Sequence, residues 1–506
     1  MKLFCSIFVL LLLMPAQSFA AAAELIIINA NVRTMAPAQP RAEAIAISGG
    51  EIIAVGSTKS IRAMAGESTK IIDAGGRLVI PGFNDAHVHF AAIGNLFSSL
   101  DLRDLKNPKE FTEKFKRYTR FLPKGRWILG SGWDNRSWVP NDPPTRGLVD
   151  EVTPENPVFV YSVDANSAFA NGRALEIAGI DKDTKEPFGG VIFRDSAGEP
   201  TGVLRGSAIS MVANRVPQNH MKNLPEVLET ASNYAASLGV TSVQDTHSDD
   251  LDDDLRLLLR QGKLKTRVYD CVTLSDWQKL AARGVKSATG NVMVRSGCVK
   301  FFAEDESEGV AQLGRDVAGA DKAGLQVAIH AIGARPNELV LNVFENTAKA
   351  NGPRDRRFRV EHAHNARPED LPRLAKMKAI ASMQPWLFFG ANGSGSDDYK
   401  KLLGLGTLIA FGSDASITDF NPLLGIYAAV NGKGAISVEQ AVSAYTIGSA
   451  YAEFQEKSKG TIEIGKLADL VILSDDIFSI DRSKIRSVRV KMTVMGGKVV
   501  YQQDKL

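Results

Sequence analysis

Short apolar runs alternate with longer segments of mixed polarity between residues 225 and 414. The apolar runs predict strands at 240–245, 266–272, 298–303, 325–331, 358–363, 380–385 and 408–414. Helical patterns fall between most of these runs, for example at 309–323, 337–350 and 368–377. Alternation of strand and helix is typical of a parallel sheet that helices cover. We therefore expect an α/β domain in this part of the chain.

An eighth strand is expected at residues 78–83, ahead of the alternating region. Eight strands with helices between them predict a (β/α)8 TIM-like barrel, in which the chemistry lies at the carboxyl ends of the strands. A doubly wound open sheet is the alternative. It is disfavoured because no glycine fingerprint follows the first strand.

Both ends of the chain are rich in short strands. Hairpins are expected at 44–56, which turns at Gly49-Gly50, and at 488–501, which turns at Gly496-Gly497. Chain termini often lie close together, so residues 24–80 and 460–506 are expected to build one small β-sandwich domain. Two unrelated β-appendages are the alternative. Residues 81–459 then form the barrel domain.

A long irregular stretch, residues 91–225, interrupts the barrel domain after its first strand. A connection of this length is usually functional or an inserted subdomain. Trp133, Asp134 and Trp138 cluster in it. They could belong to a lid over the active site, or they could pack on the body of the protein.

The first residues resemble a signal peptide. Lys2 precedes an apolar run at 7–14, and small residues around Phe19 suit cleavage after Ala20. The run is shorter than the roughly 20 residues that a membrane-spanning helix needs. Residues 1–20 are therefore expected to be removed on export to the periplasm or outside the cell. A retained anchor is the alternative.

The overall charge argues against two classes of partner. A net charge of +3 over 506 residues gives no reason to expect nucleic acid or, once the signal is removed, a membrane surface. The mature chain would keep Cys271 and Cys298, and the sequence leaves open whether they pair. A small molecule is the expected partner, and a homo-oligomer is left open.

Polar residues gather where the predicted barrel strands end. In an extended chain the motif His87-Val88-His89 directs both imidazoles to one side. Imidazole and carboxylate are ligands that suit Zn²⁺, although histidines on the polar face of a strand are the alternative. The candidate metal ligands are His87, His89, Lys300, His330, His362 and Asp414.

Lys300 lies between apolar neighbours in its predicted strand. A buried ammonium needs a partner or must lose its proton. It could form a salt bridge with Glu304 or Asp305. Alternatively, the neutral amine could take up CO₂ and become N6-carboxylysine, a carbamate that bridges two metal ions. Composition alone does not decide between them.

Five motifs in this order resemble the amidohydrolase superfamily: PGFNDAHVHF, VKFF, VAIHAIG, RVEHA and AFGSD. GSGWDNRSW, VDANSAFANGRALEIAGI, PTGVLRGSA, GVTSVQD and GKLADLVIL resemble the branch that includes N-substituted formamide deformylase. The resemblance implies that His87 and His89 hold one metal, while His330 and His362 hold a second. Carboxylated Lys300 would bridge the two ions, and Asp414 would be both ligand and catalytic proton shuttle.

The resemblance implies a metal-dependent amidohydrolase that cleaves an amide or related C–N bond of a small molecule through a metal-activated water. One or two divalent ions per chain, zinc first, are expected. Asn166, Gly206 and Ala334 stand where that branch commonly has His, Glu and Asp. These departures could change the substrate or weaken activity.

Two other functions remain open on the same barrel. One is a non-catalytic protein that binds a small molecule, and the other is a metal-dependent isomerase or lyase. The candidate substrate contacts are Trp133, Asp134, Asn166, His364 and Trp386.

Overall fold

The computed structural model describes residues 22–95, 99–163, 167–187, 190–206, 208–217, 224–248, 251–303, 310–389, 398–415 and 417–503. The predicted signal peptide, Asn166, Glu304 and Asp305 lie outside the described residues. None of the helices in the described ranges is long and apolar enough to span a membrane.

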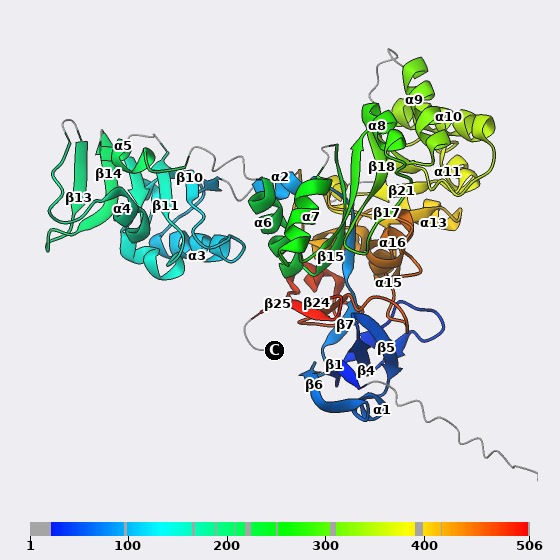
Figure 1. Cartoon of the computed structure of the whole chain (residues 1–506), viewed down its shortest axis with the longest axis horizontal. Helices are drawn as coiled ribbons and strands as arrows, with labels where there is room; N and C mark the ends of the chain where they lie inside the picture. Colours follow the sequence, from blue (N-terminus) through cyan, green and yellow to red (C-terminus); the bar gives the residue numbers. More distant parts are fainter. Residues whose placement is uncertain are drawn as a thin grey trace, which may run out of the picture.

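Eight neighbouring parallel strands form a nearly closed barrel, shown at the centre of Figure 1. Their order is β8 (Phe83–Val88), β15 (Val240–Ser248), β16 (Arg267–Thr273), β18 (Val294–Phe302), β19 (Gln326–Ile332), β20 (Arg359–His364), β21 (Ile380–Met383) and β22 (Leu408–Phe411). A parallel bridge joins Val88 in the first strand to Ala415, which follows the last strand. The predicted barrel fold is confirmed.

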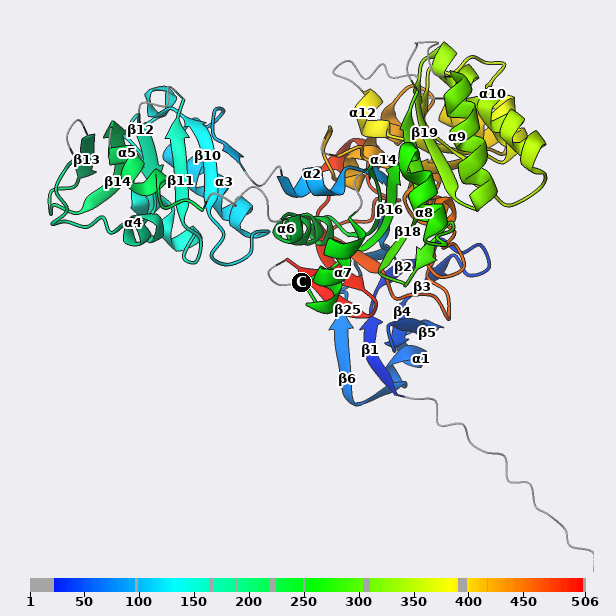
Figure 2. The ribbon, with the colours of Figure 1, turned by 45° about the horizontal axis from the view of Figure 1, so that its top comes forward.

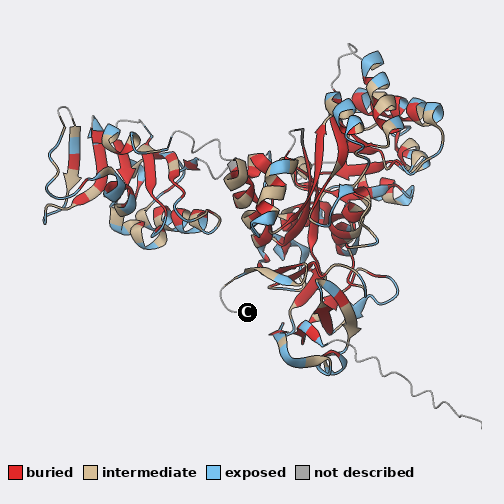
Figure 3. Ribbon diagram, in the orientation of Figure 1, coloured by how far each residue is buried: buried red, intermediate tan, exposed pale blue. Residues whose placement is uncertain are grey.

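Helices surround the barrel and bury the outer faces of its strands, so the strands form the buried centre of the domain in Figure 3. The helices in this part of the chain are α2 (Phe90–Asn95), α6 (Leu224–Ser237), α7 (Asp252–Arg260), α8 (Trp277–Ala282), α9 (Val310–Ala323), α10 (Ala334–Asn351), α11 (Leu371–Met377), α12 (Pro385–Phe389), α13 (Tyr399–Gly404), α14 (Pro422–Asn431), α15 (Val438–Ser443) and α16 (Ser449–Ala452). The short strand β17 (Thr289–Gly290) pairs with β18.

The first barrel strand begins later than predicted. Residues 78–83 were expected to open the barrel, but β7 (Leu78–Pro81) pairs with β23 (Leu470–Leu473) in another sheet and β8 begins at Phe83. Gly82 marks the crossing between the two sheets. A Cβ there would lie 2.2 Å from the Thr241 hydroxyl oxygen, so only glycine lets the chain pass this close to β15.

Strands from both chain ends share one six-stranded sheet. Its order is β25 (Lys498–Gln502), β24 (Val490–Met495), β23 (Leu470–Leu473), β7, β2 (Asn31–Arg33) and β3 (Arg41–Ala42). A second sheet contains β5 (Glu51–Gly56), β4 (Ala44–Ser48), β1 (Ala23–Ile28) and β6 (Ala65–Asp73), with α1 (Thr58–Arg62) beside it. Apolar side chains of both chain ends form one core between the sheets. Both predicted hairpins are confirmed.

The inserted stretch has its own sheet and its own two apolar clusters. The sheet contains β9 (Leu100–Asp101), β10 (Ile128–Trp133), β11 (Val158–Ser162), β12 (Ser167–Ala170), β13 (Gly190–Arg194) and β14 (Pro200–Gly206), with α3 (Pro108–Thr119), α4 (Gly172–Ala178) and α5 (Ala208–Ala213). In Figures 1 and 2 this unit lies to one side of the barrel, near α6. Phe121 contacts Tyr234 of α6 with ring centroids 5.1 Å apart.

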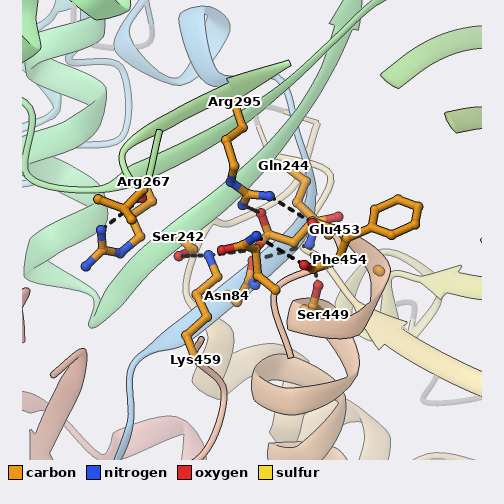
Figure 4. A network of polar contacts seen from close by, with 12 residues as sticks. Asn84, Ser242, Gln244, Arg267, Arg295, Ser449, Glu453, Phe454 and Lys459 are labelled. Carbon is orange, nitrogen blue, oxygen red and sulfur yellow. Dashed lines mark hydrogen bonds and ion pairs between the residues drawn. The ribbon is translucent and has the colours of Figure 1, made fainter. Parts of the chain in front are cut away.

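A buried group of charged side chains converges on Glu453, just after α16, as Figure 4 shows. Asn84 donates to the Glu453 carboxylate at 2.6 Å, and the Lys459 ammonium lies 2.6 Å from it. Arg295 also pairs with this carboxylate. Asn84 and Arg295 lie near the amino ends of β8 and β18, so the group closes the end of the barrel opposite the predicted metal ligands.

Arg267 and Asp469 form a buried ion pair between β16 and the residue before β23. Two hydrogen bonds of 2.7 and 2.8 Å join them. Burial opposes ionisation of Asp469, but Arg267 outweighs it and holds the pKa of the carboxyl below its usual value. The pair therefore stabilises the fold above the ordinary Asp pKa, and this stability is lost as pH falls through the lowered pKa.

We expect Arg267→Met to lower the free energy of unfolding by about 3–5 kcal/mol, because it leaves a buried carboxylate without its partner. Adding Asp469→Leu should restore much of the loss. Urea denaturation measures both effects. Arg103→Met is the matched control, since its ion pair with Asp101 is exposed. An equal shift in the control, or no shift at Arg267, would contradict the prediction.

Cys271 and Cys298 form a disulfide between the adjacent strands β16 and β18. Both side chains are fully buried inside the barrel. The bond closes a loop with a sequence separation of 27 residues, for which chain entropy gives roughly 3–4 kcal/mol of stabilisation. We expect Cys271→Ala/Cys298→Ala to lose about this much in urea denaturation. Peptide mapping should find both cysteines protected from thiol reagents until the chain unfolds, and labelling of the native protein would refute the pairing.

Candidate metal centre

The barrel brings the six predicted metal ligands to the carboxyl ends of its strands. His87 lies near the end of β8 and His89 follows it, Lys300 is in β18, His330 in β19 and His362 in β20, and Asp414 follows β22. Residues far apart in the chain meet because parallel strands end at one rim.

Three of the predicted ligands present their donor atoms to one point. His87 Nε2 lies 3.5 Å and His89 Nε2 lies 3.0 Å from Asp414 Oδ1. One donor atom from each of the three residues lies within 4.8 Å of the others. This spacing and this ligand set suit a divalent cation.

The closing seam of the barrel positions these three residues. The Asp414 amide donates to the His87 carbonyl at 2.8 Å, and the His89 amide donates to Ala415 at 2.6 Å. Gly412 permits the approach, because a Cβ there would lie 2.5 Å from the His87 nitrogen. Asp414 itself has a φ of 59°, a strained backbone of the kind found at functional sites.

The other three predicted ligands, His330, His362 and Lys300, lie beside the first group. The ring centroids of His330 and His362 are 4.3 Å apart, and those of His87 and His362 are 4.9 Å apart. Lys300 is buried, with its Nζ 4.4 Å from the centroid of the Phe302 ring. Its charge acts on His87, His330 and His362.

Protonation states in the cluster favour metal ligation. Burial, with the Lys300 charge, lowers the pKa of His87 and brings that of His330 to about 4. Burial also holds the pKa of His362 well below its usual value. Burial opposes ionisation of Asp414, but His89 and His87 outweigh it and lower its pKa to about 2. Neutral imidazole and ionised carboxylate are the forms that bind metals.

Two buried polar atoms show that the residues fit a bound metal. Within the described ranges, Lys300 Nζ and His362 Nδ1 have no hydrogen-bond partner. Buried polar groups are almost always paired in native proteins. A metal ion and a carboxylated lysine would supply the missing interactions.

Sequence reasoning did not single out Glu361, which contacts His87, or Arg359, which contacts Glu361. The Glu361 carboxylate lies 2.6 Å from His87 Nδ1, and Arg359 donates to Glu361 at 2.7 Å. Both side chains are fully buried. A signal was present, because two opposite charges two residues apart in an apolar strand point to the same face.

The predicted substrate contacts divide between two places. His364 stacks on Phe388 with centroids 3.8 Å apart, and Phe388 also meets His362 of the cluster at 6.0 Å. Trp386 packs against Phe389 in the same helix, α12. Trp133 and Asp134, by contrast, belong to the inserted unit.

Within that unit, Trp133 is part of the apolar core and donates to the Val160 carbonyl. Asp134 pairs with Arg136 at 2.7 Å. Gly206 ends β14 and Ala334 begins α10. A cavity of about 530 Å³ between α3 and α6 includes none of the six ligands.

Comparison with known proteins agrees with this geometry. The chain is 33% identical to Protein LONG AFTER FAR-RED 3 of Arabidopsis thaliana, over 95% of this chain and 92% of that protein. It is 27% identical to N-substituted formamide deformylase of Arthrobacter pascens, over 95% of this chain and 98% of the relative. An uncharacterized metal-dependent hydrolase from Pyrococcus furiosus superposes with a TM-score of 0.61 at 25% identity, covering 90% of this chain and 100% of that one.

The model of one protein family matches most of the chain. It describes the amidohydrolase family and aligns with residues 70–501. That range contains the whole barrel, the inserted unit and the C-terminal strands. The chain belongs to the amidohydrolase family.

Proposed function

We propose that this protein is an exported, metal-dependent hydrolase that cleaves an amide or related C–N bond, other than a peptide bond, in a small molecule. The observation that carries the proposal is the meeting of four imidazoles, a lysine and a carboxylate at one rim of the barrel. A relative named as a formamide deformylase supports the C–N bond class.

Zinc is the proposed metal, with one or two ions per chain. His87, His89 and Asp414 would hold one ion, while His330 and His362 would hold another, and Lys300 as N6-carboxylysine would be a ligand of both. Such an ion supplies Lewis-acid polarisation of the scissile carbonyl and lowers the pKa of the attacking water.

Asp414 is the proposed proton carrier. Its carboxylate is ionised near neutral pH, since its pKa is about 2. In this ionised form the carboxylate has a free lone pair, so it could accept a proton from the attacking water as a general base and return it to the leaving nitrogen as a general acid. His364 and Trp386 are proposed to contact the substrate beside Phe388.

Metal analysis and a product screen on the full-length protein test this proposal. We expect at least one equivalent of bound divalent metal and release of free amine from some members of a panel of N-formyl and N-acyl amines. Less than one equivalent of metal without turnover would favour the non-catalytic binding protein. A product formed without addition of water would favour an isomerase or lyase.

Export is proposed from the N-terminal sequence, and the Cys271–Cys298 disulfide supports it. Disulfides persist mainly in oxidising compartments outside the cytosol. N-terminal sequencing of the protein recovered from the periplasm or medium should begin at Ala21. An uncut N-terminus on cytosolic protein would contradict export.

A further inference from the structure

A carboxylate stands directly behind the metal ligand His87. Glu361 Oε2 lies 2.6 Å from His87 Nδ1. Glu361 is buried against the Arg359 guanidinium, which donates two hydrogen bonds to its carboxyl group at 2.7 and 3.2 Å, and a positive charge this close favours the ionised form of a carboxyl group. An ionised carboxylate can only accept a hydrogen bond. The proton of His87 is therefore on Nδ1, and the lone pair of Nε2 faces Asp414.

Arg359 holds the Glu361 carboxylate in place through two hydrogen bonds. Its Nε donates to Glu361 at 2.7 Å, and one terminal nitrogen donates to the same carboxylate at 3.2 Å. That nitrogen also donates to the Ala86 carbonyl in β8 at 2.5 Å. Arg359 is fully buried, and each of its three guanidinium nitrogens has a partner. The planar guanidinium therefore has one orientation.

Gln244 in β15 fixes the remaining side of Arg359. The Gln244 amide nitrogen donates to the Ser449 carbonyl at 2.7 Å, so its amide oxygen points to Arg359 and accepts at 2.5 Å. Gln244 and Ser449 both appear in Figure 4, beside the charges that converge on Glu453. A series of hydrogen bonds between side chains thus runs from Gln244 through Arg359 and Glu361 to His87.

We propose that Glu361 is a positioning residue for the metal site. It holds His87 as the Nδ1–H tautomer, and Arg359 and Gln244 fix its own orientation. The inference rests on the metal site of the proposed function. Carboxylates behind a ligating histidine typically raise metal affinity about 10–100-fold. The Arg295–Glu453 pair at the opposite end of the barrel resembles the Arg359–Glu361 pair in burial and charge, but only Glu361 touches a metal ligand.

This resemblance supplies a matched control. Zinc loss from the full-length, zinc-loaded protein to a chromogenic chelator is compared for wild type, Glu361→Gln and Glu453→Gln. We expect Glu361→Gln to weaken zinc binding about 10–100-fold, while Glu453→Gln lowers stability and leaves zinc affinity unchanged. Glu361→Asp, which keeps the charge, should recover part of the affinity and serves if the Gln variant does not fold.

A second readout needs no change at Glu361. In ¹⁵N spectra of histidine-labelled wild-type protein, with His87 assigned through His87→Gln, Nδ1 should be protonated. Equal zinc loss in Glu361→Gln and Glu453→Gln, or a proton on His87 Nε2, would overturn the inference. Zinc loss is measured without substrate, so a protein that shows the Glu361 effect but cleaves no C–N bond would refute only the proposed function. An active enzyme without the Glu361 effect would refute only the positioning role.

Discussion

Asp414→Asn is expected to lower turnover by about two to four orders of magnitude, the usual contribution of a general acid–base group, while the protein keeps its metal. The amide of asparagine retains one oxygen for ligation but cannot take the proton of the attacking water. The main-chain bonds that place residue 414 beside His87 do not involve the side chain. The variant should therefore fold and bind metal normally.

The measurement is kcat/KM for the best amide found in the screen, together with metal content. Asp419→Asn is the control, since Asp419 is exposed, lies five residues away and has the same chemistry. It should behave as wild type. Turnover by Asp414→Asn within a few-fold of wild type, with metal present, would refute the proton-transfer role. Loss of both metal and turnover would show that Asp414 acts chiefly as a ligand.

Much of the site could be predicted because the hydrophobic pattern shows where each barrel strand ends. Parallel strands end at one rim, so polar residues at the ends of predicted strands had to meet if the barrel formed. His87, His330, His362 and Asp414 meet there. The alternation of strands and helices was sufficient for the barrel itself.

The start of the barrel could not be predicted from pattern alone. Residues 78–83 carry no polar side chain, so hydrophobic periodicity does not show which of them leave one sheet and enter the next. The contact between Gly82 and Thr241 decides it, and these residues are far apart in sequence. Arg359 and Glu361 were missed for a similar reason. The role of a charged residue in a strand depends on the side chain that it pairs with, and His87 is far from both in sequence.

The sequence predicts that residues 91–225 are an insertion, but it does not show whether their aromatic side chains form a lid or a core. Trp133 was a candidate substrate contact, and the structure places it in an apolar core with Trp138 and Phe111. A buried core aromatic and a lid aromatic have the same local sequence signal. Only packing between distant segments separates them.

Lys300→Met is expected to lower turnover by roughly 100-fold or more, about 3 kcal/mol of transition-state stabilisation, because a metal ligand is lost. Metal content should fall with it. Burial lowers the pKa of Lys300 to about 8, although Glu361 and Asp414 act in the opposite direction. At pH 8 about half of the amine is neutral, against roughly 0.4% for an ordinary lysine. Only the neutral amine can take up CO₂.

Carboxylation should therefore depend on bicarbonate and rise with pH through about 8. Native mass spectrometry should show about 44 Da added to Lys300, since the modification adds one CO₂, and the mass should be lost in acid. Lys459 is the internal control. It is also buried with a pKa lowered to about 8, but its ammonium is paired with Glu453 and Ser242.

Burial alone would carboxylate both lysines, whereas an unpaired amine beside metal ligands would carboxylate only Lys300. The added mass on Lys459, or an unmodified Lys300 in fully metal-loaded protein, would show that Lys300 acts as a plain ammonium. In that case its charge would compete with the metal for Asp414, and Lys300→Met would raise zinc affinity rather than lower it. Whether Lys300→Met lowers or raises zinc affinity therefore separates the carbamate from the salt bridge, the two alternatives that the sequence left open.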